Sequence, residues 1–202
     1  MRVLFAHGFE GSPDGSKPGY MRDVLGWDVT APTMSELGWN IEQETDVLLR
    51  LIDTNEYDIV AGSSMGGLAA ANASALRPNA NFSLLLIAPA FGLIDLWRES
   101  IGEKGLEIWK ETGERAHHHH GFGEDILLSW DFVETAKRMS WPKMAHPTII
   151  LHGVNDDVVP INVSKKMKEE NSNVLDLIEI VDGHRMQEAK PHFAVAARKL
   201  GY

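Results

Sequence analysis

Short apolar runs recur along this chain and alternate with amphipathic stretches. The runs are rich in Val, Ile and Leu and are bounded by glycine or polar residues, which is typical of buried strands. We expect strands at residues 2–6, 27–31, 57–61, 83–88, 148–151 and 175–181.

The intervening stretches carry helical patterns. Ile41, Leu48, Leu51 and Ile52, for example, recur at spacings of three, four and seven with charged residues between them. We expect helices at residues 41–53, 65–77, 161–170 and 188–200. Strands that alternate with helices predict an α/β fold with a mostly parallel central sheet of about six strands flanked by helices.

Residues 91–141 do not follow this alternation of strands and helices. They hold no convincing strand, and their two amphipathic segments span residues 93–109 and 125–139. The stretch is too long for a plain connection, so we expect a helical insertion that forms a lid or cap across one end of the sheet. The alternative is a pair of ordinary crossover helices packed on the sheet face. We therefore expect one domain over residues 1–202, with a lid insertion at about 91–141.

Composition narrows the class of protein. The chain has no cysteine, which excludes disulfides and thiolate metal sites. Its 29 acidic residues outnumber 19 basic ones, which argues against a nucleic-acid partner. No apolar run approaches the roughly twenty residues of a membrane span. The apolar run at the start of the sequence is too short for a signal peptide. We expect a cytoplasmic protein, and no pattern indicates an oligomeric state.

Gly62-Ser63-Ser64-Met65-Gly66 carries the strongest chemical signal. It joins a predicted strand to a predicted helix, as the Gly-x-Ser-x-Gly nucleophile elbow does. Ser64 is the candidate nucleophile. The alternative is a glycine-rich turn in which Ser63 or Ser64 caps the helix.

A serine nucleophile needs a base, and the base needs an orienting partner. The strand at 148–151 leads into a loop with two acids, Asp156 and Asp157, before Pro160 opens the next helix. Either carboxylate can hold an imidazole in the correct tautomer. Asp156 is the preferred candidate and Asp157 the alternative.

His184 is the candidate general base. It follows Gly183 after the last predicted strand, although a histidine at such a position is often only a surface residue. The order Ser64, Asp156, His184, each at the carboxyl end of its own strand, is much more specific than any single motif.

An oxyanion hole is expected beside the serine. One donor is the backbone N–H of Met65, which follows the nucleophile at a helix start. The other is the N–H of Phe9, in a loop where Gly8 and Gly11 allow close approach to the serine. His7 is expected to form hydrogen bonds within this loop rather than to transfer protons.

These motifs together resemble the α/β-hydrolase superfamily, in particular its small single-domain serine esterases. The resemblance covers the oxyanion loop, the elbow, the acid loop and the histidine loop: His7-Gly8-Phe9, Gly62 to Gly67, His152 to Pro160, and Gly183-His184. It implies Asp156 as the acid. It also implies that the family's antiparallel edge is missing or reduced, because the chain begins at the equivalent of the third strand.

His117-His118-His119-His120 invites a metal interpretation, because imidazoles bind zinc, copper and nickel. Consecutive side chains rarely converge on one ion, so we expect a solvated loop in the lid, with no metal and no cofactor. Four tryptophans of the insertion form either an aromatic pocket wall or packing in the lid: Trp97, Trp109, Trp130 and Trp141. The same choice is open for Phe91, Leu93 and Met186.

The sequence thus predicts a serine hydrolase that cleaves a small-molecule carboxylic ester through an acyl-enzyme intermediate. The same scaffold also supports thioesterase, peptidase, acyltransferase or carbon–carbon hydrolase activity. A further alternative is a ligand-binding protein that keeps the fold without catalysis.

Overall fold

Six parallel strands form the central sheet of the computed structural model, which describes residues 1–202. The strand order is β2-β1-β3-β4-β7-β8, and every pairing between neighbours is parallel. The strands are β1 (Arg2–Ala6), β2 (Asp28–Thr30), β3 (Ile59–Ser63), β4 (Ser83–Ile87), β7 (Thr148–Gly153) and β8 (Val174–Ile180). The predicted α/β fold class is confirmed, and the six predicted strands are present with small shifts at their ends.

The sheet changes its winding direction at β1. The chain passes from β1 outward to β2, returns past β1 to β3, and then proceeds in order to β8. In open parallel sheets, such a switch point leaves a crevice beyond the carboxyl ends of the two diverging strands, and ligands bind there. The loops that follow β1 and β3 are therefore the place to look for a site.

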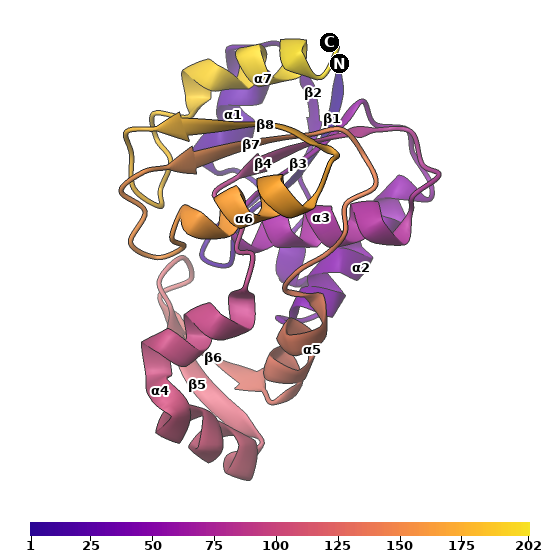
Figure 1. Cartoon of the computed structure of the whole chain (residues 1–202). Helices are drawn as coiled ribbons and strands as arrows, with labels where there is room; N and C mark the ends of the chain where they lie inside the picture. Colours follow the sequence, from indigo (N-terminus) through magenta and orange to yellow (C-terminus); the bar gives the residue numbers. More distant parts are fainter.

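Helices cover both faces of the sheet (Figure 1). On one face lie α1 (Ser16–Asp23) and α7 (Phe193–Lys199), which follows a 3-10 turn (Lys190–His192). The other face carries α2 (Ile41–Ile52), α3 (Met65–Leu76) and α6 (Asn162–Glu170), and a 3-10 turn, η1 (Met34–Leu37), precedes α2. The sequence pattern did not predict α1 or η1, because both are short and bury few residues.

The strand residues alternate between two hydrophobic cores. Val3 and Phe5 of β1 pack in the core beneath α1 and α7, whereas Leu4 and Ala6 pack in the core beneath α2 and α3. Because both faces are covered, the four inner strands are apolar along nearly their whole length, whereas the edge strands β2 and β8 include exposed polar residues such as Asp28 and Glu179. This is why short continuous apolar runs located the inner strands in the sequence.

The insertion, residues 91–141, forms a lobe beside this layered body (Figure 1). It consists of α4 (Leu93–Thr112), β5 (Glu114–His119), β6 (Glu124–Ser129) and α5 (Asp131–Met139). The expectation of a wholly helical insertion is wrong, because β5 and β6 pair as an antiparallel hairpin. Ile126 and Leu128 are buried and alternate with exposed neighbours, a period of two that is too short to stand out in the sequence.

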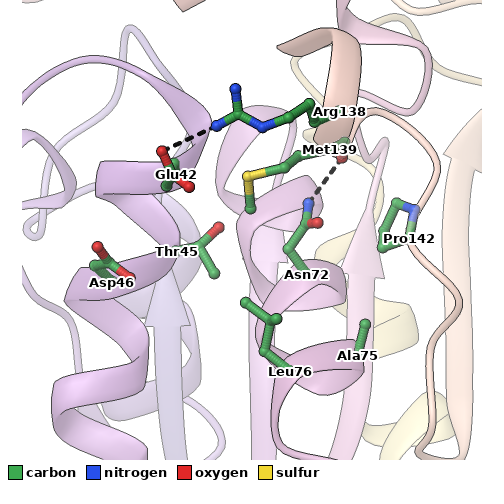
Figure 2. A pocket seen from close by; sticks show the side chains of 9 residues that line it. All are labelled: Glu42, Thr45, Asp46, Asn72, Ala75, Leu76, Arg138, Met139 and Pro142. Atoms are coloured by element: carbon green, nitrogen blue, oxygen red, sulfur yellow. Dashed lines mark hydrogen bonds and ion pairs between the residues drawn. The ribbon is translucent and has the colours of Figure 1, made fainter. Parts of the chain in front are cut away.

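The two ends of the insertion are fastened together and to the body. Gly92 N–H donates to Ser140 O at 3.1 Å, which joins the entry to the exit. Asn72 Nδ2 on α3 donates to Met139 O at 2.9 Å, and Arg138 pairs with Glu42 on α2 at 3.2 Å (Figure 2). The last two contacts border a groove of about 320 Å³ between α2, α3 and the end of α5.

The inside of the lobe is aromatic. Trp109 is 1% exposed, its indole N–H donates to Leu128 O at 2.9 Å, and its ring stacks on Phe132. Trp97 packs against both rings, with centroids 5.0 Å from Phe132 and 5.5 Å from Trp109. Trp109 therefore serves the packing of the lobe. No helix of the structure combines the length and apolar character needed to cross a bilayer.

Candidate active site

Ser64 lies at the turn between β3 and α3 in a backbone conformation that few side chains adopt. Its φ is 54° and its ψ is −121°. Such a conformation costs on the order of 1–3 kcal/mol and persists only where the surrounding structure imposes it. Ser64 N–H donates to Ile87 O at 2.9 Å, and Ala90 N–H donates to Ser64 O at 3.0 Å. The serine is thus held between β3 and the end of β4 in the manner of a nucleophile elbow.

Two glycines allow this turn to form. A Cβ atom at Gly62 would overlap the backbone of Gly66, and a Cβ atom at Gly66 would overlap the carbonyl oxygens of Ala6 and His7. Both positions therefore exclude every residue except glycine. The close approach of α3 to β1 follows from the glycines that the sequence motif contains.

The structure brings the three predicted side chains together at the carboxyl ends of β3, β7 and β8. His184 Nε2 lies 3.0 Å from Ser64 Oγ, and His184 Nδ1 lies 2.8 Å from Asp156 Oδ2. An ionised carboxylate can only accept, so Nδ1 carries a proton and Nε2 is free to accept the serine O–H. The Ser64 side chain makes no capping bond to α3, so the helix-cap alternative does not describe it.

Asp156 occupies a buried position surrounded by donors. Its Oδ1 accepts from the N–H groups of Val158 at 3.0 Å and Val159 at 2.8 Å. Burial favours the protonated form, but hydrogen bonds from His152, His184 and Val159 outweigh it and lower the pKa of the Asp156 carboxyl well below its ordinary value. The side chain is therefore an anion at neutral pH.

The alternative acid, Asp157, is exposed to solvent and makes no hydrogen bond to His184. The structure thus separates two adjacent aspartates that the sequence pattern leaves nearly equivalent. The side chain of Asp156 is 0% exposed and that of His184 is 20% exposed, so only this pair combines a buried acid with an imidazole that solvent reaches.

The loop that carries His184 is fixed from both sides. Asp182 accepts from Gly183 N–H at 2.7 Å and from Glu188 N–H at 2.8 Å, which closes the loop on itself. Lys17 Nζ on α1 donates to Arg185 O at 3.0 Å. The sequence did not predict the contact from Lys17, because a lysine in a short polar helix is indistinguishable from a solvated one.

The loop after β1, residues 7–11, lies directly against the serine, and we call it the β1 loop. A Cβ atom at Gly8 would lie 3.1 Å from Ser64 Cβ. His7 Nε2 accepts from Met34 N–H at 3.1 Å, and its Nδ1 donates to Gly8 O at 2.9 Å. Burial lowers the pKa of His7, which keeps the ring neutral. His7 therefore forms hydrogen bonds within and beside the loop, as predicted.

The histidine tract is not a solvated loop, and that expectation is wrong. His117, His118 and His119 belong to β5, and side chains alternate across a strand. His118 points to solvent and pairs with Asp125, whereas His119 is 0% exposed and contacts Phe9. No group of three or more histidine or acidic side chains is arranged to hold a metal ion.

Met186, Phe91 and Leu93, which the sequence left between pocket and core, are buried in the hydrophobic cores. Met186 is 0% exposed although it lies in the loop that carries His184, and its φ of 48° turns the chain inward there. None of the three is free to form an exposed wall beside Ser64.

Comparison with solved structures defines the class of fold. The chain is similar to a protein from Agrobacterium vitis S4, with 21% identity over 98% of this chain and 87% of that one, at a TM-score of 0.81. It is similar to alpha/beta hydrolase domain-containing protein 10 from mouse, with 19% identity over 98% and 88% at a TM-score of 0.75. It is also similar to a monoacylglycerol lipase from Paleococcus ferrophilus, with 18% identity over 98% and 92% at a TM-score of 0.65. The fold is the α/β-hydrolase fold.

Residues 2–198 match the model of the family described as an uncharacterised protein family, UPF0227. The chain belongs to this family. Comparison with curated proteins gives no match.

Proposed function

We propose that this chain is a serine hydrolase that cleaves carboxylic esters through an acyl-enzyme intermediate. The observation that carries the proposal is the continuous hydrogen-bonded series from Ser64 Oγ through His184 to Asp156 Oδ2. It ends on a buried carboxylate and begins on a strained serine at the switch point of the sheet. The lipase among its structural neighbours acts on esters, which is consistent with this reaction.

In the proposed reaction, Ser64 Oγ attacks the ester carbonyl carbon while His184 Nε2 takes the serine proton. Asp156 stabilises the imidazolium that forms. The N–H groups of Met65 and Phe9 donate to the oxyanion. His184 then gives the proton to the departing alkoxide, and water repeats the same steps on the acyl-enzyme to release the acid.

We propose further that residues 1–202 act as one domain in which the insertion serves as a lid. The support is that the two ends of the insertion are joined to each other by the Gly92–Ser140 hydrogen bond, and that its exit is held to the body by the Asn72–Met139 hydrogen bond. Its hairpin also reaches back to the β1 loop beside the serine.

The test compares Ser64→Ala with Ser63→Ala, its immediate neighbour in the motif. We expect Ser64→Ala to lose nearly all turnover of p-nitrophenyl butyrate while it remains folded, and Ser63→Ala to keep most of it. A fluorophosphonate should label the wild-type protein at Ser64, because only an activated serine reacts with it. Wild-type turnover in Ser64→Ala, or no labelling of Ser64, would contradict the proposal.

A second comparison tests the ester class. Esters, thioesters and amides with the same acyl chain should be cleaved by the wild-type protein with the highest kcat/KM for the esters. A clear preference for thioesters or amides would retain the triad and reject the ester as substrate.

A further inference from the structure

The β1 loop is held by the insertion, although the two are about one hundred residues apart in the sequence. The imidazole of His119 on β5 lies 2.7 Å from the carbonyl oxygen of Phe9 through its Nε2 atom. A carbonyl can only accept, so Nε2 carries the proton and donates. The other ring nitrogen, Nδ1, accepts from Phe122 N–H at 3.1 Å. His119 therefore bridges the turn of the hairpin and the β1 loop with both nitrogens used.

Glu10, the next residue in the β1 loop, makes a second connection. Its Oε2 accepts from Gly121 N–H at 3.1 Å, and its Oε1 lies 3.2 Å from His117 Nε2. Hydrogen bonds from His117 and Gly121 outweigh the effect of burial and lower the pKa of the Glu10 carboxyl. The backbones also touch, because a Cβ atom at Gly121 would lie 2.8 Å from Glu10 O.

Apolar contacts complete the junction. The ring of Phe9 packs edge-on against Trp39 of the body, with centroids 5.5 Å apart, and against His117 and Phe132 of the insertion at 5.3 and 6.1 Å. His119 stacks on Phe122 with centroids 4.3 Å apart. Phe9 thus lies between the body and the insertion and contacts both.

This arrangement fixes the two peptide planes on either side of the Phe9 Cα atom. The plane that contains Phe9 N–H also contains Gly8 O, which accepts from Gly11 N–H at 2.8 Å and from His7 Nδ1. The following plane contains Phe9 O, which accepts from His119. Because each peptide unit is rigid, two held planes leave Phe9 N–H with a single direction. The hydrogen bonds to Gly8 O, in the first plane, come from the β1 loop itself. The hydrogen bond to Phe9 O, in the second plane, comes from the insertion.

We propose that His119 is a positioning residue for the oxyanion hole: the hairpin of the insertion, through His119, holds the Phe9 amide in the direction that acyl transfer requires. This inference rests on the proposed function, since it assigns a cause to the geometry of one of its donors. Through this role of His119, the insertion has a direct effect on the rate of catalysis. An insertion that moved away from the body would remove this constraint from the oxyanion hole.

The test uses substitutions at His119 and a matched substitution at His118, which lies on the opposite, solvent-facing side of β5. His119→Gln keeps an N–H donor at the distance of Nε2, whereas His119→Asn is too short to reach Phe9 O and His119→Leu has no donor. kcat and KM for p-nitrophenyl butyrate are measured per active site, after titration of Ser64 with a fluorophosphonate.

We expect His119→Leu and His119→Asn to lower kcat by about tenfold to a hundredfold, with KM within about twofold, because a misplaced oxyanion donor acts on the transition state. His119→Gln should recover most of kcat, and His118→Leu should match the wild type. Should His119→Leu fail to fold, the comparison of His119→Gln with His119→Asn carries the test.

Equal kcat in the wild type and His119→Leu, or equal losses in His119→Gln and His119→Asn, would overturn the inference and leave the proposed function intact. A wild-type protein that neither hydrolyses esters nor labels at Ser64 would contradict the proposed function, and the inference with it. The two failures are therefore distinct results.

Discussion

His152 Nε2 lies 3.3 Å from Asp156 Oδ2, the same oxygen that accepts from His184. His152 is 0% exposed, and its Nε2 also lies 2.9 Å from Val159 O, so this nitrogen carries the proton. Its Nδ1 accepts from Ser164 Oγ at 2.7 Å. His184 thus donates to this carboxylate oxygen, and the buried imidazole of His152 lies close to the same oxygen. The contacts of Asp156 with His152 and with the Val158 and Val159 N–H groups hold the carboxylate in the position from which it orients His184.

The first prediction concerns the choice between the adjacent aspartates. Asp156→Asn should reduce kcat for an ester by about ten-thousandfold, since an amide no longer holds His184 in the required tautomer. Asp157→Asn, at an exposed position, should keep kcat near the wild-type value. Steady-state kinetics on both variants checks this. A large loss in Asp157→Asn with an active Asp156→Asn would reverse the assignment.

The second prediction concerns stability at acid pH. The folded-state pKa of Asp156 is lowered. Between the folded and the unfolded pKa, the unfolded state therefore binds a proton that the folded state does not. The free energy of unfolding that it contributes is fully present above the unfolded pKa, near 3.9, and is lost as the pH falls toward the folded pKa. The stability difference between the wild type and Asp156→Asn should therefore shrink below about pH 4.

Urea unfolding of both proteins at a series of pH values measures this difference, with Asp157→Asn as the control. A difference that stays constant from pH 6 to pH 3 would show that the Asp156 carboxyl is not selectively stabilised as an anion by the fold.

The third prediction concerns Lys17. Lys17→Met keeps most of the aliphatic side chain but removes the hydrogen bond to Arg185 O, so the loop that carries His184 loses its contact with α1. We expect kcat to fall by about tenfold, because small displacements of a catalytic group are costly. Lys165→Met is the matched control, since Lys165 forms only an exposed ion pair with Glu179. An unchanged kcat in Lys17→Met would show that Asp182 alone fixes the loop.

The sheet and the convergence of Ser64, Asp156 and His184 could be predicted from the sequence because their signals are local. A buried parallel strand is a continuous apolar run, and the turn at Ser64 requires glycines at fixed offsets. The positions of Asp156 and His184 followed from the rule that side chains at the carboxyl ends of parallel strands converge. Each of these inferences needs only a few neighbouring residues and the strand order.

The hairpin of the insertion and its contact with the β1 loop could not be predicted in this way. One strand of the hairpin contains consecutive histidines, and the other shows only Ile126 and Leu128 as an alternating apolar pair. The bond from His119 to Phe9 spans 110 positions, and neither residue carries a sequence signal of the other. His152 is similar, because a histidine inside an apolar strand resembles any satisfied core residue.

The fourth prediction concerns the glycines of the elbow. Gly66→Ala should lower the free energy of unfolding by about 3 kcal/mol or more, because the added methyl group would overlap the carbonyl oxygens of Ala6 and His7 and force α3 away from β1. Gly19→Ala is the matched control. Gly19 lies in α1 with only a flexible Asp23 oxygen 3.9 Å from the added Cβ, and alanine favours the helix by about 0.5–1 kcal/mol. In thermal melting, Gly66→Ala should therefore have a lower melting temperature than the wild type and Gly19→Ala a higher one. If Gly66→Ala had the same melting temperature as the wild type, α3 would approach β1 less closely than the turn at Ser64 requires.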